Sequence, residues 1–293
     1  MANALVRKII GDVFEYDYLP KEFKEDELAK YKERTRKKFR ELARSWNTEL
    51  NTEWLFRHYL SVKMILATSV MLTSIEFAKR KNLKIVEPYL LYYALLTASR
   101  GLIFTIPDVT WNNGEIVTMT HKKIINVVSD LVGQISKEKG EELKNKLSTA
   151  RDYRELFSYK FPASGTDITK GVQLIDYEEA IELAALLAEI AQFNSEQLEY
   201  CIERYCENKV FEINLEFFKE GIEYKLGNVP LIDREDLYRL DYIFRKQRYP
   251  LSLYFTMTEG LVEDFFGSWC PEEETEDDVY NPDENWRIIF PVP

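Results

Sequence analysis

The residue in this chain best suited to chemistry with a phosphate is an arginine inside an apolar segment. Arg100 is the one charged residue of Tyr89–Phe104, which reads YLLYYALLTASRGLIF. A buried guanidinium is costly unless an acid pairs with it or water reaches it. In a cleft, Arg100 would bind a phosphate or stabilise a charged transition state. In a closed core it would instead pair with an acid such as Asp152 or Glu53.

A histidine is the second candidate, because its usual pKa of about 6.5 lets it exchange a proton near neutral pH. The chain has only His58 and His121. His121 comes at the start of a predicted helix after a loop, where an active-site side chain can be exposed. His58 falls inside a long predicted helix beside Arg57 and is the weaker candidate. For both, the simpler alternative is an ordinary surface or packed histidine.

Two charged segments could support such a site. The first is Arg151-Asp152-Tyr153-Arg154, from which we take Arg151, Asp152 and Tyr153 as supporting residues, although a solvated helix face looks the same. The second is Lys30–Arg44, with eight bases against two acids. Its candidate phosphate-binding residues are Arg34, Arg36, Lys37, Lys38 and Arg40. The net charge of −11 favours a solvated face or docking of the chain's own acidic tail there.

Several classes of site are disfavoured. The chain has no GxGxxG, GxxxxGK[ST], GxSxG or HExxH motif, so nucleotide-cradling loops, the hydrolase elbow and helical zinc proteases are disfavoured. Its three cysteines and two histidines have no metal-site spacing, and we predict neither a metal nor a cofactor. An odd number of cysteines without framework spacing is typical of reduced thiols in the cytoplasm.

The elements that must position these residues are mostly helices. Glycine (11) and proline (10) are scarce, which disfavours an all-β fold. The longest uncharged apolar-rich run, Met64–Ile75, is too short for the roughly 20 residues of a bilayer span, so we predict a core helix and no membrane. Apolar periodicity predicts helices over these ranges: Glu25–Trp46, Asn51–Lys81, Tyr89–Phe104, Thr120–Ile135, Glu138–Tyr159, Tyr177–Phe193, Ser195–Cys206, Arg234–Arg245 and Leu251–Phe266.

One strand is predicted, at Phe211–Phe217, where apolar and polar residues alternate. The fold class is therefore mainly α, a helical bundle with a small β element and an acidic C-terminal tail. We divide the chain into a basic helical segment (1–50), a helical core (51–193), a C-terminal helical region with short strands (194–270) and a tail (271–293). That tail has eight acids and no base in Glu272–Glu284, and then the apolar end WRIIFPV.

Three features in order resemble the HEPN superfamily of prokaryotic helical proteins, and within it the YaaC-like proteins. The first is the tyrosine-rich helix that ends in a small residue followed by Arg100. The second is Ala150-Arg151-Asp152-Tyr153, which is similar to the family's "R…ADY" segment. The third is the Ala-rich helix Glu178–Ala188 after a linker. The resemblance covers about residues 52–193 and implies a HEPN-like helical core.

Active HEPN ribonucleases cut RNA without a metal, using an Arg and a His four to six residues apart. The nearest equivalents here, Arg100 and His121, are separated by a longer insertion. The resemblance therefore leaves two functions open. The first, which the absent spacing and the negative charge favour, is a non-catalytic interaction or assembly module in a defence or toxin system, with a protein partner or a second copy. The alternative is a metal-independent endoribonuclease that binds RNA, with His121 as general base and Arg100 stabilising the phosphorus centre. A weaker third function is an acidic mimic of nucleic acid, suggested by the tail.

Overall fold

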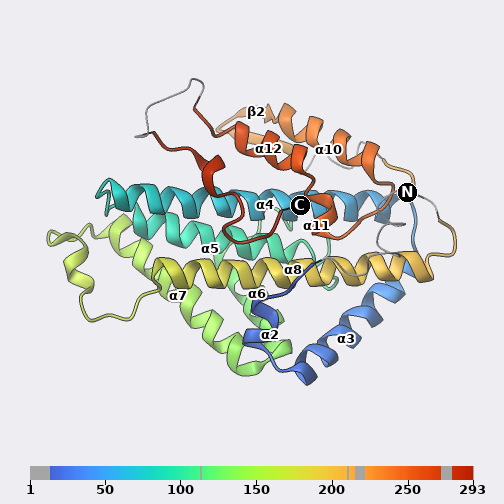
Figure 1. Ribbon diagram of the computed structural model, residues 1–293, viewed down its shortest axis with the longest axis horizontal. Helices are drawn as coiled ribbons and strands as arrows, with labels where there is room; N and C mark the ends of the chain where they lie inside the picture. The colour runs from blue at the N-terminus through green and yellow to red at the C-terminus, as the bar shows by residue number, and fades with distance from the viewer. Residues whose placement is uncertain (1–13, 113, 210, 215–221, 272–278, 293) are drawn as a thin grey trace.

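The computed structural model describes residues 14–112, 114–209, 211–214, 222–271 and 279–292, and these form a mainly α-helical protein with one small sheet (Figure 1). The expected fold class is confirmed. The elements are α2 (Tyr18–Glu22), α3 (Glu25–Arg44), α4 (Thr48–Arg80), α5 (Glu87–Ile103), α6 (His121–Ile135), α7 (Lys137–Tyr159), η1 (Gly165–Thr169), α8 (Tyr177–Tyr205), β1 (Glu223–Leu226), β2 (Val229–Ile232), α10 (Arg234–Lys246), α11 (Leu253–Thr256), α12 (Glu259–Gly267) and η3 (Pro282–Asn285).

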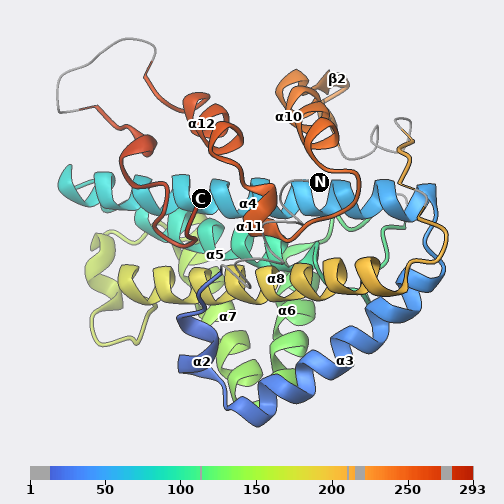
Figure 2. The same ribbon diagram turned by 45° about the vertical axis from the view of Figure 1, so that its right-hand side comes forward.

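Two long helices, α4 and α8, organise the bundle. Figures 1 and 2 show them running alongside each other, with α5 between them. Helices α10 and α12 lie on the far side of α4, while α2, α3, α6 and α7 lie on the other side of the molecule. The most extensive helix contact is between α4 and α5, and α5 also packs on α6, α7 and α8. Helix α5 is therefore central, as its apolar sequence predicts.

The segment that carries Arg100 is enclosed by its neighbours. Leu95 and Leu102 on α5 are fully buried. Gly101 allows the close approach of α4, because a Cβ atom there would lie 3.4 Å from the carbonyl oxygen of Ser61. The Ser61 hydroxyl also donates a hydrogen bond to the Gly101 carbonyl at 2.8 Å. The prediction that this segment is a buried helix is confirmed.

Helix α4 begins earlier than its apolar pattern predicts. We expected Asn51 or Thr52 to cap this helix, but Asn47 caps it by accepting a hydrogen bond from the Leu50 amide at 2.9 Å. Asn51 is fully buried and donates to the carbonyl oxygens of Glu212 and Arg248. The first turn of α4 is thus a packed polar turn, which apolar periodicity does not reveal.

Helix α8 is continuous, although we expected one helix to end at Phe193 and another to begin at Ser195. Ser195 is buried and donates to the Gln192 carbonyl within the helix at 2.7 Å. Its hydroxyl also accepts a hydrogen bond from the Leu253 amide at 3.0 Å. Ser195 is therefore a packing residue and not a helix cap, and α8 passes unbroken across the expected division at residues 193 and 194. By contrast, the single helix predicted over Leu251–Phe266 is two helices, α11 and α12.

The small sheet lies later in the chain than predicted. Residues 211–214 form no strand, and residues 215–217 of the predicted strand lie outside the described residues. Instead β1 and β2 form an antiparallel hairpin in which Tyr224 opposes Leu231 and Leu226 opposes Val229. Its two-residue loop starts at Gly227 with φ of 63°, which favours glycine. Four-residue strands are too short for alternation to mark them.

The C-terminal end docks on the body of the protein. Tyr280 donates a hydrogen bond to the carbonyl oxygen of Val70 on α4 at 2.7 Å. Phe290 is buried against Phe14, with ring centroids 5.1 Å apart. The acidic run expected at Glu272–Glu284 lies partly outside the described residues, since 272–278 are not described. The described flanks of this run lie at the opposite end of the molecule from α3 (Figures 1 and 2).

Helix α4 is the one described helix long and apolar enough to cross a membrane by length and composition alone. The core helix of a soluble protein passes the same test. Here 56% of the most apolar stretch of α4 is buried inside the protein. This burial is compatible with a soluble protein whose α4 is a core helix.

The close contact between α6 and α7 gives a stability prediction. A Cβ atom on Gly140 would lie 2.5 Å from the Cα atom of Gly133 and 2.7 Å from the Ser129 carbonyl oxygen. We expect Gly140→Ala to lower the free energy of unfolding by roughly 1–3 kcal/mol, because the two backbones must move apart. Urea unfolding measures this change. The control is Gly267→Ala, where a Cβ meets nothing within 4 Å. Equal stability of the two variants would refute the close contact.

Candidate active site

Helices α5, α6 and α7 bring five side chains together around the start of α6: Tyr92, Tyr93, Arg100, His121 and Arg154. Tyr92 is buried, Tyr93 is exposed, and the other three are partly exposed. His121 is the first residue of α6 because Thr120 caps this helix, its side chain accepting from the Lys123 amide at 3.4 Å. The partial positive charge of a helix N-terminus therefore lies at His121.

The His121 imidazole is held by tyrosines. Its Nδ1 atom lies 3.0 Å from the hydroxyl oxygen of Tyr92, within hydrogen-bond distance. The Tyr93 ring meets the His121 ring edge-on, with centroids 6.0 Å apart. Burial lowers the pKa of His121 below 6.5, and the nearby charges of Arg100 and Arg154 lower it further. His121 is therefore a neutral imidazole at neutral pH, as a general base must be.

Arg100 reaches the segment that leads into α6. Its guanidinium donates hydrogen bonds to the carbonyl oxygens of Val117 (3.2 Å) and Met119 (3.5 Å). Within the described ranges no acid lies within ion-pair distance of Arg100. The acids considered for it, Glu53 and Asp152, pair with Arg57 and Arg151 respectively. Burial lowers the pKa of Arg100 from its usual value, but an arginine stays charged at neutral pH. Its positive charge is thus left for an anion.

Arg154 completes the cluster and was not among the residues that we predicted for it. Its guanidinium carbon lies 5.1 Å from the centroid of the Tyr92 ring and 5.9 Å from that of the Tyr93 ring. Its side chain is 12% exposed, and the nearest carboxylate oxygen, on Glu155, is 3.6 Å away. Helical spacing could have identified it, because Arg154 shares the inward face of α7 with the buried residues Leu147, Ala150 and Phe157.

The three predicted supporting residues lie at the edge of the cluster or outside it. Asp152 is exposed and accepts a hydrogen bond from Arg151 at 2.9 Å. Tyr153 packs edge-on against Phe157, with ring centroids 5.3 Å apart. Arg151 pairs with Asp152 and Glu155. Burial raises the pKa of Tyr92, and the positive charges of Arg154 and Arg151 lower it by less. Among the described residues, Asp152 and Tyr153 have no hydrogen bond, ion pair or ring contact with His121 or Arg100.

The predicted phosphate-binding residues of α3 have different surroundings. Arg34 donates to the Gln134 carbonyl, and Lys38 pairs with Asp108. Arg36 and Arg40 lie over tyrosine rings of α8, whereas Lys37 is exposed. These five residues therefore do not form one site with His121.

His58 is a core residue, in agreement with the simpler alternative. It is 1% exposed, and its Nδ1 atom lies 2.7 Å from the Leu251 carbonyl oxygen, to which it donates. Burial lowers its pKa to about 4. The unfolded chain, with a pKa of about 6.5, therefore takes up a proton more readily than the folded protein does.

This difference predicts how stability depends on pH. The contribution of a neutral His58 is fully present above pH 6.5 and is lost as the pH falls from about 6.5 to about 4. The loss is on the order of 3 kcal/mol, at 1.36 kcal/mol for each pKa unit. We expect the stability difference between wild type and His58→Gln to shrink by this amount between pH 7 and pH 4, as measured by urea unfolding. A pH-independent difference would show that His58 is not buried neutral.

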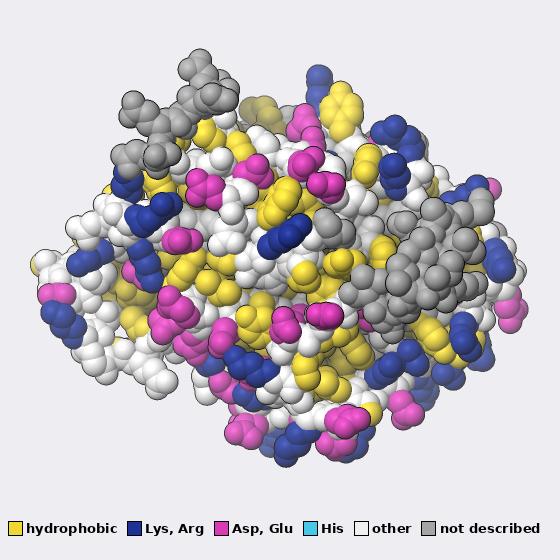
Figure 3. All heavy atoms as spheres, viewed as in Figure 1, with side chains coloured by type: hydrophobic (Ala, Val, Ile, Leu, Met, Phe, Trp, Pro, Cys, Tyr) yellow, Lys and Arg dark blue, Asp and Glu magenta, His cyan; other side chains and the backbone are white. Residues whose placement is uncertain are grey.

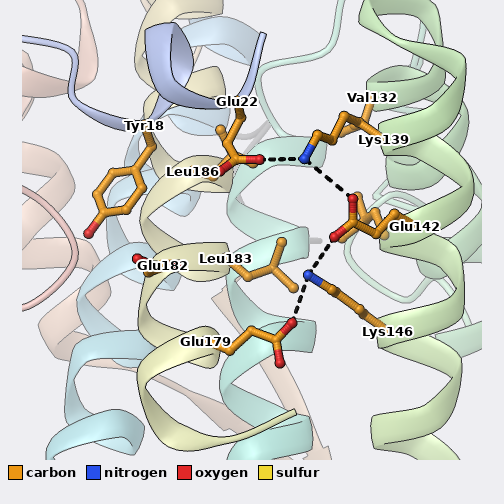
Figure 4. Close-up of a pocket in the computed structure, with 11 residues that line it drawn as sticks. Tyr18, Glu22, Val132, Lys139, Glu142, Lys146, Glu179, Glu182, Leu183 and Leu186 are labelled. Atoms are coloured by element: carbon orange, nitrogen blue, oxygen red, sulfur yellow. Dashed lines mark hydrogen bonds and ion pairs between the residues drawn. The ribbon is translucent and has the colours of Figure 1, made fainter. Parts of the chain in front are cut away.

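A separate small pocket lies between α2, α7 and α8, with a volume of about 60 Å³. Figure 4 shows acids and bases alternating along its wall, where Lys139 joins Glu22 to Glu142, and Lys146 joins Glu142 to Glu179. The hydrogen bond to Glu22 raises the pKa of Lys139, and the bond to Lys146 lowers the pKa of Glu142. The lining has four acids and only two bases, Lys139 and Lys146, so this pocket does not attract an anion such as a phosphate.

Comparison of the chain with protein-family models, with characterised proteins and with solved structures found no match. The site must therefore be interpreted from its own geometry. In the part of the chain that the structure describes, no group of three or more His, Cys, Asp or Glu side chains is placed to hold a metal ion. What the cluster does offer is a neutral imidazole flanked by two guanidinium groups and a helix N-terminus, an arrangement suited to a phosphate.

Proposed function

We propose that this protein is a HEPN-like, YaaC-like helical protein of prokaryotic type that cleaves RNA without a metal ion at the site formed by Arg100, His121 and Arg154. The observation that carries the proposal is the meeting of these side chains from α5, α6 and α7 around Tyr92. The order of the motifs in the sequence supports the kinship. The distance along the chain between Arg100 and His121 is compensated by folding, since the segment before α6 returns to Arg100.

The chemistry requires His121 as a base. If Nδ1–H donates to the Tyr92 hydroxyl oxygen, Nε2 is free to accept the proton of a ribose 2′-hydroxyl. The 2′-oxygen then attacks phosphorus, and the bond from phosphorus to the 5′-oxygen breaks. The 5′-oxygen takes a proton from water, and the hydroxide that this leaves takes the proton from His121. The products are a 2′,3′-cyclic phosphate and a 5′-hydroxyl. Arg100 and Arg154 stabilise the negative charge that grows on the phosphoryl oxygens.

The test is incubation of purified protein with total RNA in EDTA, followed by gel analysis. We expect fragments with the wild-type protein and none with His121→Ala or Arg100→Ala. Intact RNA in the presence of folded wild-type protein would overturn the proposal. Cleavage that survives both substitutions would remove the site assignment.

A second candidate function is an interaction or assembly module in a defence or toxin system of the cytoplasm. It is favoured by the exposed apolar face of the hairpin, formed by Tyr224, Leu226, Val229 and Leu231, each at least 41% exposed. Concentrated exposed apolar side chains mark interaction sites. Mass photometry and pull-down from the native host test for a second copy or a protein partner, and a strictly monomeric protein without a retained partner would count against it. The third function, an acidic mimic of nucleic acid, depends on a run of which residues 272–278 lie outside the described residues.

A further inference from the structure

A row of four positive side chains follows one side of α3: Lys32, Arg36, Arg40 and Arg44. They recur every four residues, so they stand above one another on the helix. The row extends for about 18 Å, at 1.5 Å of rise per residue. Like charges at this spacing destabilise a helix when nothing compensates them. We call these four residues the basic row.

The other basic residues of α3 have different surroundings: Lys30 pairs with Asp26, and Arg34 donates to the Gln134 carbonyl. The neighbouring row, Glu33, Lys37 and Glu41, alternates in sign at the same spacing. On the side that faces α6, Lys38 pairs with Asp108. By contrast, in the described segments no member of the basic row has an acid within 4 Å. The same is true of the exposed Arg204 on α8. The four members of the basic row, which share one side of α3, therefore have no acidic partner in the described residues.

Tyrosines of α8 hold the middle of the basic row in place. The guanidinium carbon of Arg36 lies 4.0 Å from the centroid of the Tyr200 ring, and that of Arg204 lies 5.1 Å from the same centroid. Arg40 lies 5.0 Å from the centroid of the Tyr205 ring. In the part of the chain that the structure describes, Arg36 uses only its Nε–H, which donates to Gln197 at 2.7 Å. Stacking thus orders the cations while the terminal N–H groups of Arg36 stay free for a ligand.

The surface view agrees with this distribution. Figure 3 shows Lys and Arg side chains gathered at its lower right, where Figure 1 places the C-terminal part of α3. The described flanks of the acidic tail lie at the other end of the molecule (Figures 1 and 2). The described part of the chain therefore supplies no anion for the basic row, although the whole protein has a net charge of −11.

We propose that the seam between α3 and the C-terminal half of α8 binds the phosphodiester backbone of single-stranded RNA. A single row of cations beside aromatic rings matches one strand, because it follows one backbone. The inference depends on the proposed function in that this RNA is the substrate of the His121 site. The binding residues are Lys32, Arg36, Arg40, Arg44 and Arg204, whereas Arg34, Lys37 and Lys38 are not among them.

The test measures fluorescence anisotropy of a labelled single-stranded RNA with the full chain carrying His121→Ala, which prevents cleavage. Two double variants are compared with it: Arg36→Gln/Arg40→Gln, and Lys32→Gln/Arg44→Gln, in which both substituted side chains are exposed. Each phosphate contact contributes about 0.6 log units of affinity at 0.15 M salt, so each pair is expected to weaken binding roughly tenfold. The slope of log affinity against log salt should fall by about 1.4, at about 0.7 for each contact.

The matched control is Arg34→Gln/Lys37→Gln, which removes the same charge from the same helix. We expect it to change the affinity less than twofold. An equal loss in control and basic-row variants would overturn the inference, as would tighter binding of double-stranded RNA. Binding of a peptide of residues 271–284 to the basic row in preference to RNA would overturn it too.

The same measurements distinguish this inference from the proposed nuclease function. RNA binding through the basic row by a wild-type protein that cuts no RNA would refute the nuclease and leave this inference standing. If the wild-type protein cuts RNA but its RNA affinity does not change in the basic-row variants, the nuclease would stand and this inference would be refuted.

Discussion

Replacement of His121 by alanine is expected to lower the single-turnover rate of RNA cleavage by at least about 100-fold, which is the usual contribution of a positioned general base. Arg100→Gln should lower the rate by roughly 100- to 1000-fold, because it removes a cation from the site where charge develops. RNA affinity of the His121→Ala protein should stay within about twofold of wild type. Stopped time courses with excess protein measure the rates, and fluorescence anisotropy of a labelled RNA measures the affinity.

The pH profile provides a second readout of the same prediction. The pKa of His121 is lowered below 6.5 by burial and by the charges of Arg100 and Arg154. The wild-type rate should therefore rise with pH while His121 loses its proton, and should reach its plateau at a lower pH than an ordinary histidine would give. The control is Asp152→Asn, which changes an exposed residue of the adjoining helix and should leave the rate unchanged. Loss of activity in the control, with none in His121→Ala, would contradict the assignment.

The second large effect is expected at Arg57, whose buried guanidinium fixes the chain after α5. Arg57 is 1% exposed and donates to the carbonyl oxygens of Phe104 (2.8 Å), Ile106 (2.6 Å) and Val109 (2.8 Å). It also pairs with Glu53 at 3.0 Å. Arg57→Met should lower the free energy of unfolding by about 3–5 kcal/mol, because it leaves an acid and three carbonyl groups without their donor.

The matched control for Arg57 is Arg245→Met. Arg245 also pairs with an acid four residues earlier, Asp241, but both side chains are about two-thirds exposed, at 69% and 66%. This substitution should change stability by less than about 1 kcal/mol. Urea unfolding of both variants measures the contrast. Similar stabilities would show that the Arg57 guanidinium is not fixing the segment that follows α5.

Much of the fold could be predicted from sequence because apolar periodicity reports burial. The all-round apolar sequence around Leu95 and Leu102 indicates a central helix, and α5 is one. Where polar residues are packed in the core, apolar periodicity does not predict the helix boundaries correctly. Ser195 looks like a helix cap but is a buried hydrogen-bonding residue of α8, and Asn51 likewise belongs inside α4. Long-range partners such as Leu253 and Arg248 decide these cases, and sequence spacing does not show them.

The candidate site was partly visible in the sequence. Arg100 and His121 were marked by their unusual surroundings, an apolar helix and a helix start after a loop. Their meeting could not be derived, because it depends on the path of the segment that carries Val117 and Met119. The choice of Asp152 and Tyr153 over Arg154 followed the motif rather than the helical face, and the inward face of α7 carries Arg154.

The chemistry of the fragment ends tests most directly whether the protein cleaves RNA with His121 as general base. Total RNA is incubated in EDTA with wild-type protein and with His121→Ala, and the ends are identified by enzymatic labelling. We expect 2′,3′-cyclic phosphate and 5′-hydroxyl ends with wild type and their absence with the variant. Fragments with 3′-hydroxyl and 5′-phosphate ends, or the same fragments from both proteins, would contradict it.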